Sequence, residues 1–161
     1  MKWDKRKLHS LLLETLKTEL NATLSAAETA KEGATHEEAV AKSKYDTHGL
    51  ELSYLAGSQF ERARLVESKI ALLTNSLFKD FDEDDEIEVG ALVFLQGKAP
   101  KPQAYLISNL GAGLDLILQN ERILVISPES PLGEALIGLY LGDMIDSKER
   151  QKNAYTVVGL W

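Results

Sequence analysis

Apolar residues recur at heptad spacing through the first half of the chain, and this spacing limits the fold more than any other feature. In the first segment Leu13, Leu20, Ala27 and Ala34 stand seven residues apart. The seam of a second segment steps by fours and threes and comprises Leu52, Ala56, Gln59, Ala63, Val66, Ile70, Leu73 and Leu77. Stripes this narrow are typical of two paired helices rather than of a helix in a globular core. We therefore expect a two-helix coiled coil.

A glycine and a capping motif predict where the first helix ends. Gly33 can adopt the left-handed conformation that often follows a helix C-terminus. Thr35 and Glu38 have the spacing of a capping box, which predicts a short helix over about 36–45. The first arm of the hairpin is therefore expected at about 4–31.

Two interpretations of the second arm stay open. Gly49 is costly inside a helix, which favours an arm at about 49–78 and a tip at about 32–48. Two arms of nearly equal length are what an antiparallel hairpin needs. The alternative is one unbroken helix over 36–78, with only residues 31–35 as the turn.

Charge is unevenly distributed between the two halves of the chain. Residues 1–79 hold 12 Lys and Arg against 11 Asp and Glu, whereas residues 80–161 hold 6 against 14. This difference predicts two units, a hairpin over 1–79 and a second domain over 80–161. The acidic second domain argues against direct binding to a nucleic-acid backbone, which needs clustered Lys and Arg. The acidic run at 79–90 is interpreted as a solvated linker, because it lacks the glycine and glutamate spacing of a calcium-binding loop.

The second half has the pattern of a small antiparallel sheet with one short helix. Runs rich in β-branched and aromatic residues, "EVGALVFLQ", "QAYLISNL", "ERILVISP" and "NAYTVVGLW", are bounded by Gly, Pro and Asn. Ser130 is expected to cap the short helix, with Pro131 at its first position and Gly138 at its end. The fold class is therefore α+β.

The segment "SPESPLGEALIGLYLGDMID", residues 127–146, resembles the C-terminal domain of the bacterial Gre transcript-cleavage factors. The shared pattern is Ser130-Pro131-Leu132 opening a helix, Ala-Leu-Ile-Gly at 135–138, and Gly-Asp at 142–143. The resemblance implies an FKBP-like antiparallel β domain that docks on RNA polymerase through Ser130, Pro131 and Leu132. It also implies a long hairpin that enters the polymerase secondary channel.

In that family acidic residues at the hairpin tip help hold a Mg²⁺ of the polymerase active site, so that backtracked RNA is cleaved. The candidates for this role are Glu37, Glu38, Asp46 and Glu51. The tip departs from the family pattern, because Ala34 stands where an aspartate is expected in one alignment and Gly49 where a glutamate is expected in the other. A factor that stimulates cleavage and one that enters the channel without cleavage therefore both remain open.

The resemblance implies a protein that is no enzyme and has no cofactor of its own, sharing Mg²⁺ at most with the polymerase. RNA polymerase is the expected partner, with nucleic acid contacted only inside that complex. We also expect a cytoplasmic monomer without a membrane span, and a solvated first turn at "KWDKRK". The alternatives are an adaptor like the nucleoside diphosphate kinase regulators, whose hairpin is short, and a prolyl isomerase suggested by fold alone. The absence of cysteine excludes disulfides and thiolate metal sites.

Overall fold

The computed structural model describes residues 3–35, 47–146 and 154–161. The chain forms two compact units, which are described separately below. One is the helical segment Leu13–Asn75, and the other combines Met1–Leu12 with Ser76–Trp161. The first helix therefore contributes to both units.

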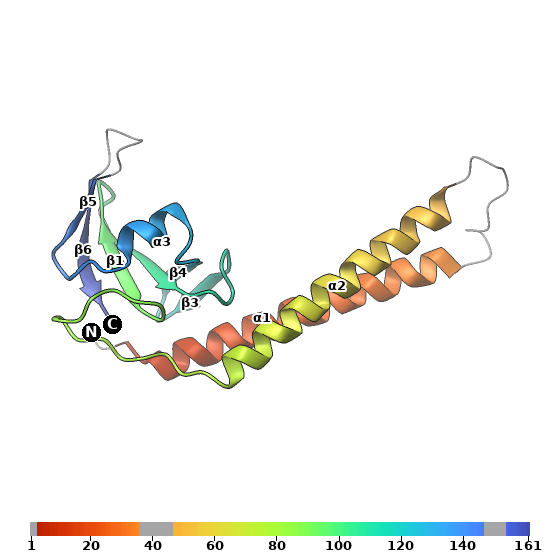
Figure 1. Ribbon diagram of the computed structural model, residues 1–161, viewed down its shortest axis with the longest axis horizontal. Coiled ribbons are helices and arrows are strands. Elements are labelled where there is room, and N and C mark those ends of the chain that lie inside the picture. Colours follow the sequence, from red (N-terminus) through yellow and green to blue (C-terminus); the bar gives the residue numbers. More distant parts are fainter. Residues whose placement is uncertain (1–2, 36–46, 147–153) are drawn as a thin grey trace. The chain divides into compact units, whose positions relative to one another are not determined.

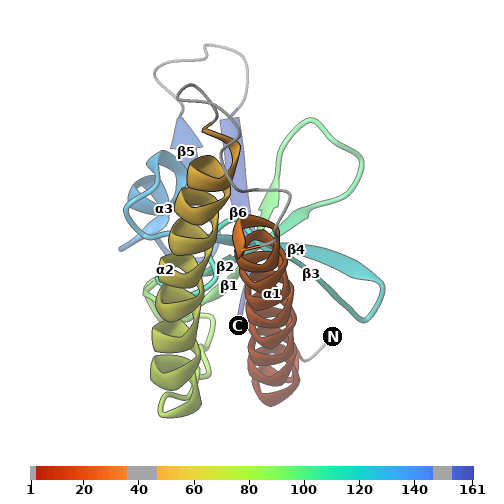
Figure 2. The same cartoon turned by 90° about the vertical axis from the view of Figure 1, so that its right-hand side faces the viewer.

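The helical unit is an antiparallel hairpin of α1, Lys5–Thr35, and α2, His48–Thr74 (Figure 1). The Nη2 atom of Arg62 lies 2.8 Å from the Oε1 atom of Glu19. Further along, a Cβ atom on Gly33 would lie 3.1 Å from the Cδ1 atom of Leu52. A later residue of α1 thus faces an earlier residue of α2, as antiparallel pairing requires, and the two helices lie side by side when viewed along their length (Figure 2).

The predicted seams are buried or half-buried along most of the hairpin. On α2 the buried positions are Ala56, Ala63, Val66 and Leu73. On α1 only Ala27 of the predicted seam is buried, beside Thr23 and Ala30, whereas Leu13, Leu20 and Ala34 are half-buried. The prediction for Leu77 is wrong: it lies beyond the end of α2 and its side chain is exposed. The coiled-coil hairpin predicted from spacing is otherwise confirmed.

The predicted end of the first helix at Gly33 is wrong, because α1 continues to Thr35. A Cβ atom at this position would require the tip of the Leu52 side chain to shift by a few tenths of an ångström. The hydroxyl of Thr35 donates to the carbonyl oxygens of Lys31 and Glu32, each at 3.1 Å. The capping box predicted for Thr35 and Glu38 stays a prediction, because Glu38 lies outside the described residues.

The second helix begins close to the predicted position. Thr47 is the N-cap of α2 and has non-helical dihedral angles, and Gly49 lies in the first turn. An unbroken helix over 36–78 is therefore wrong, and the arm ends at Thr74 rather than at residue 78. The short helix expected at about 36–45 lies outside the described residues.

The second unit contains a six-stranded sheet in the order β3-β4-β2-β1-β6-β5. Its elements are β1 Leu92–Gln96, β2 Gln103–Ile107, β3 Asp115–Leu118, β4 Glu121–Ile126, α3 Pro131–Leu136, β5 Met144–Asp146 and β6 Ala154–Leu160. All strand pairs are antiparallel except β2 with β4, which are parallel. The α+β class with one short helix is confirmed. The sheet is mostly antiparallel as expected; β2 and β4 run parallel because the chain passes through β3 at the sheet edge before β4 returns beside β2.

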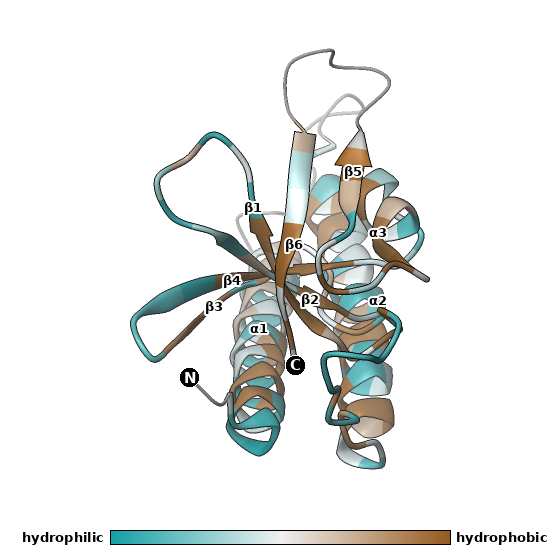
Figure 3. Cartoon of the chain, turned by 90° about the vertical axis from the view of Figure 1, so that its left-hand side faces the viewer, coloured by the Kyte–Doolittle hydropathy of each residue, from teal (hydrophilic) through white to brown (hydrophobic). Residues whose placement is uncertain are grey.

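Both faces of the sheet are covered by apolar residues, and Figure 3 shows hydrophobic stretches along β1 and β2. On one face Val93 and Val157 share a buried cluster with Leu136 of α3. On the other, the ring of Phe94 lies 5.4 Å from the ring of Trp3 and 5.0 Å from that of Trp161. The start of the chain therefore completes the core of the β unit. Among the described residues, no helix is long and apolar enough to cross a membrane.

Candidate functional site

The sequence places candidate functional residues at the hairpin tip and at the start of α3. At the tip, Glu51 lies in the first turn of α2 and its side chain is exposed. Its Oε1 atom accepts a hydrogen bond from the hydroxyl of Thr47 at 3.0 Å, and its backbone N–H donates to the Thr47 carbonyl at 2.9 Å. A carboxylate at a helix N-terminus is favoured by the helix dipole, so local structure alone explains its position.

The other acidic candidates, Glu37, Glu38 and Asp46, lie outside the described residues. Convergence of the tip carboxylates on one metal ion therefore stays a prediction. Of the four candidate carboxylates, only that of Glu51 lies in the described residues. Its hydrogen bond with Thr47 holds it at the start of α2.

The docking candidates form the N-terminus of α3, where the predicted helix cap is confirmed. Their role in docking stays a prediction. The hydroxyl of Ser130 accepts a hydrogen bond from the backbone N–H of Gly133 at 3.1 Å. The same hydroxyl donates to the carbonyl of Ser127 at 2.6 Å. Pro131 occupies the first turn, where its missing N–H costs nothing, and Glu134 adds a favourable charge there.

Close packing fixes the shape of this loop. A Cβ atom on Gly133 would lie 2.1 Å from the carbonyl oxygen of Ser127, so no other residue fits without movement. Leu132 packs against the buried cluster beneath α3, whereas Pro131 is exposed. The helix ends at Leu136, and Gly138 adopts a positive φ of 81° as predicted for its C-terminus. The result is a rigid loop that presents Pro131 to solvent.

The acidic run before the sheet has local partners. The Nζ atom of Lys79 lies 4.0 Å from Oδ1 of Asp85 and 3.8 Å from Oε2 of Glu88. The backbone N–H of Asp82 donates to Oδ2 of Asp85 at 2.9 Å. In the described part of the chain, no group of three or more His, Cys, Asp or Glu side chains could hold a metal ion.

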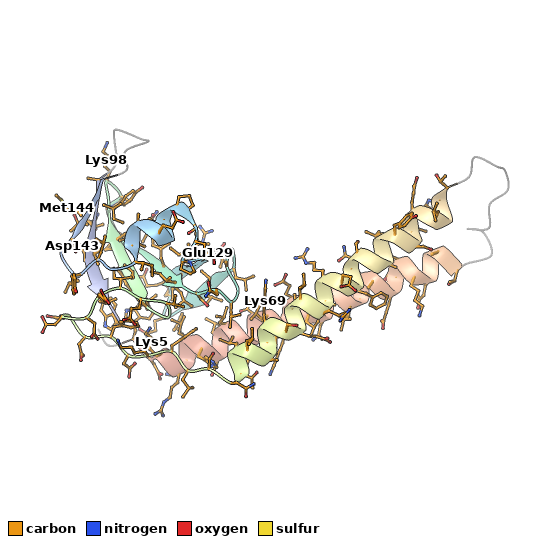
Figure 4. All side chains as sticks on the ribbon, viewed as in Figure 1. Lys5, Lys69, Lys98, Glu129, Asp143 and Met144 are labelled. Carbon is orange, nitrogen blue, oxygen red and sulfur yellow. The ribbon has the colours of Figure 1, made fainter. Side chains whose placement is uncertain are left out.

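A buried lysine at the start of α1 is the feature that the sequence interpretation missed. The solvated first turn expected at "KWDKRK" is wrong at Trp3 and Lys5, which are buried, whereas Asp4, Arg6 and Lys7 are exposed. Figure 4 labels Lys5 at the start of α1. The ammonium of Lys5 donates to the carbonyl oxygen of Gly90 and lies 5.1 Å from the centre of the Phe81 ring. Burial lowers the pKa of Lys5 to about 8, while the negative charge of Asp80 acts in the opposite direction.

One sequence signal indicates that the neighbours of Lys5 at the start of α1 pack inward. Asp4 caps α1, because its Oδ1 atom accepts hydrogen bonds from the backbone N–H groups of Arg6 at 3.0 Å and Lys7 at 3.2 Å. Trp3 precedes the cap and Leu8 lies in the first turn, which is the spacing of a hydrophobic staple. Both side chains are buried.

Comparison with solved structures finds several similar chains, and three of them are described here. The first is the GreA factor homolog 1 (Gfh1) of Thermus thermophilus, at 20% identity over 92% of this chain and 94% of that chain, with a TM-score of 0.37. A second structure, of the transcription factor Gfh1, has 20% identity over 93% of both chains and a TM-score of 0.36. Thermus aquaticus Gfh1 has 22% identity over 92% of this chain and 90% of that chain, with a TM-score of 0.37.

No protein-family model matches the chain, and no curated protein matches it. Identities and TM-scores at the level of the Gfh1 structures establish neither the family nor the activity of this chain.

A shallow hollow of about 260 Å³ lies over β2 and β4 of the β unit. Its polar lining includes Arg122, and its aromatic lining is Tyr105, whose hydroxyl donates to Oε1 of Gln103 at 2.8 Å. Burial raises the pKa of Tyr105, and the neighbouring Tyr155 acts in the same direction. Arg122 is committed to two hydrogen bonds with Asp115, each 2.8 Å long. One half-buried tyrosine and an exposed ion pair give little support to a prolyl isomerase site.

Proposed function

We propose that this protein is a Gre-like transcription elongation factor, which binds RNA polymerase and inserts its helical hairpin into the secondary channel. The observation that carries the proposal is the joining of two parts in one chain. A long antiparallel hairpin is combined with a β unit in which Ser130, Pro131 and Leu132 open α3. The β unit carries the pattern that residues 127–146 share with the Gre family, and the hairpin corresponds to the long hairpin that this resemblance implies.

The rigid loop at α3 is the proposed docking element. Ser130 is used internally as a helix cap and Leu132 packs inward, which leaves Pro131 as the side chain offered to a partner. Because the loop is held by Gly133 and Ser127, it needs little ordering when it binds. We propose that it contacts the polymerase while the hairpin enters the channel.

The length of the hairpin favours this function over the adaptor alternative. The two helices have 31 and 27 residues. At about 1.5 Å per residue, arms of this size extend about 40 Å, which suits entry into a deep channel. The nucleoside diphosphate kinase regulators, by contrast, have a short hairpin.

The protein would lend ligands rather than catalyse a reaction itself. Glu51, with Glu37, Glu38 and Asp46, would supply carboxylate oxygens to a Mg²⁺ ion of the polymerase, and such an ion is commonly held by only one or two protein carboxylates. Cleavage chemistry would remain with the polymerase, and no cofactor would belong to this chain. The protein would act in the cytoplasm, where it would meet nucleic acid only inside the polymerase complex.

A binding assay with RNA polymerase core tests the proposal. The purified protein is expected to bind the core enzyme and to compete with a cleavage factor for it. Pro131→Glu should weaken binding, since glutamate is compatible with the first turn of a helix but alters the exposed loop. Lys98→Gln is the matched control, because it makes the same change of charge at an exposed residue of the β1–β2 loop. Absence of both binding and competition would refute the proposal.

Transcript cleavage in stalled elongation complexes separates the two modes of action. If the protein stimulates cleavage, replacing Glu37, Glu38, Asp46 and Glu51 together with alanine should abolish the stimulation. If it binds and slows elongation without cleavage, the hairpin acts as a channel-blocking arm. Stimulation that persists unchanged in the quadruple variant would exclude these carboxylates as ligands.

A further inference from the structure

A second apolar stripe runs along α2 on the side away from α1. Its members are Leu50, Tyr54, Leu65 and Leu72, whose exposed fractions are 56%, 71%, 65% and 62%. At 100° per residue these four positions fall within about 60° of one another. The buried seam around Ala63 and Val66 lies on the opposite side of the helix. Among the described residues of α1, by contrast, no large hydrophobic side chain is exposed.

This outer stripe has the spacing of a helix-pairing seam. The positions on its centre line follow one another by fours and threes, and they are Leu50, Tyr54, Gly57, Glu61, Leu65, Ser68 and Leu72. A Cβ atom on Gly57 would have no neighbour within 4 Å, so an open notch lies in the middle of the stripe. A stripe that alternates large side chains with a notch can interlock with a matching helix.

We propose that the outer face of α2 pairs antiparallel with α2 of a second copy of this chain, about a two-fold axis at Glu61. In that register, positions equally distant from residue 61 meet. Leu65 enters the notch at Gly57 of the partner copy, and Leu72 meets Leu50. Each contact occurs twice, as two-fold symmetry requires.

Charge favours the same register. At 100° per residue, Glu51 and Lys69 fall on one flank of the stripe, ten and eight residues from Glu61, so antiparallel pairing brings each beside its opposite in the partner copy. Within one helix they are about 27 Å apart and do not meet. Figure 4 labels Lys69 on α2. The two copies of Glu61 face each other at the axis, where each has a cation nearby, because Arg64 Nη1 lies 3.2 Å from Glu61 Oε1 in the same helix.

The seam from Leu50 to Leu72 extends about 33 Å, which makes one helix–helix contact per dimer. An interface of this size lies at the lower end of specific interfaces, so we expect a dissociation constant on the order of micromolar. The proposed dimer differs from the monomer expected from the sequence, because that expectation did not rest on the outer face of α2.

Sedimentation velocity of the full chain from about 1 to 300 µM tests the pairing, and a monomer–dimer equilibrium is expected. Leu65→Glu should weaken dimerisation at least tenfold without unfolding the helix, because Leu65 is exposed in the single chain. A chain that remains monomeric up to about 300 µM would overturn the proposal.

Cysteine crosslinking tests the axis, since the natural chain has no cysteine. Glu61→Cys should form a disulfide-linked dimer rapidly under mild oxidation. Glu67→Cys is the matched control, because it removes the same charge from an exposed position on another side of α2. Equal crosslinking of the two variants would overturn the assigned face.

Charge reversal tests the register. Glu51→Lys and Lys69→Glu should each weaken the dimer about fivefold, and the double variant should restore it. Restoration can arise only between chains, because the two residues are too far apart within one helix. A double variant as weak as either single variant would overturn the antiparallel register.

The inference does not depend on the proposed function. If the protein binds polymerase but never dimerises, the dimer proposal is refuted and the proposed function stands. If it dimerises but does not bind polymerase, the proposed function is refuted and the dimer proposal stands.

Discussion

The buried ammonium of Lys5 gives the β unit a pH dependence whose sign and size follow from the structure. In the unfolded chain the pKa of Lys5 is the ordinary 10.5, whereas burial lowers it to about 8 in the folded protein. Between these values the unfolded chain holds a proton that the folded chain has released. The free energy of unfolding therefore rises as the pH rises through this window. With these two pKa values, the gain between pH 7 and pH 10 is about 2.5 kcal/mol.

The matched variant is Lys5→Met, which keeps most of the side-chain volume and removes the titrating amine. Urea unfolding at pH 7, 8.5 and 10 can be followed by tryptophan fluorescence, because Trp3 and Trp161 lie 6.5 Å apart in the β unit. The natural protein should gain about 2.5 kcal/mol relative to Lys5→Met between pH 7 and pH 10.

Comparison with Lys5→Met separates the contribution of Lys5 to the pH dependence of stability from that of the tyrosines. Burial raises the pKa of Tyr105, so its ionisation in the unfolded chain lowers stability above about pH 10, but the variant keeps this residue. A difference between natural protein and variant that stays constant from pH 7 to pH 10 would refute the assigned environment of Lys5.

Three further predictions follow from packing and capping. Gly133→Ala should destabilise the β unit by about 1–3 kcal/mol in thermal unfolding, because its Cβ atom would collide with the Ser127 carbonyl; a variant as stable as the natural protein would contradict this packing. Ser130→Ala should cost about 1 kcal/mol through loss of the α3 cap, and no measurable loss would show that the cap is dispensable. Ala63→Leu should destabilise the hairpin by about 1–3 kcal/mol by forcing the helices apart, measured as helical ellipticity against temperature, whereas Leu65→Ala on the exposed face should change it little.

The hairpin was predictable because helix pairing leaves a periodic record in sequence. Buried residues such as Ala56, Ala63 and Val66 must recur on one face of α2, and they do. The end of α1 was not predictable by the same rules. Gly33 is a helix terminator by local preference, yet it lies two residues before the end of α1 at Thr35.

In the β unit, long strands with strong apolar patterns were predicted and short edge strands were missed. The edge strands β3 and β5 have four and three residues, which is too short for alternation to be recognised. Missing β3 also hid the parallel pairing of β2 with β4, because that pairing depends on the detour through the edge.

In the candidate site, contacts between sequence neighbours were predictable and contacts between distant residues were not. The cap at Ser130 was predictable because it is made by neighbours in sequence, Gly133 and Ser127. The environment of Lys5 was not, because its partner Gly90 is 85 residues away. The convergence of the tip carboxylates is also a question of distant residues, and it stays a prediction.

We propose that the hairpin tip reaches the interior of RNA polymerase. A photo-crosslinking residue at Thr47, the N-cap of α2, can test this in a stalled elongation complex. We expect a crosslink to polymerase segments that line the secondary channel, together with weaker crosslinking when Pro131→Glu is added. A tip that forms no crosslink while the protein is bound, or that crosslinks only to the outer surface of the polymerase, would contradict it.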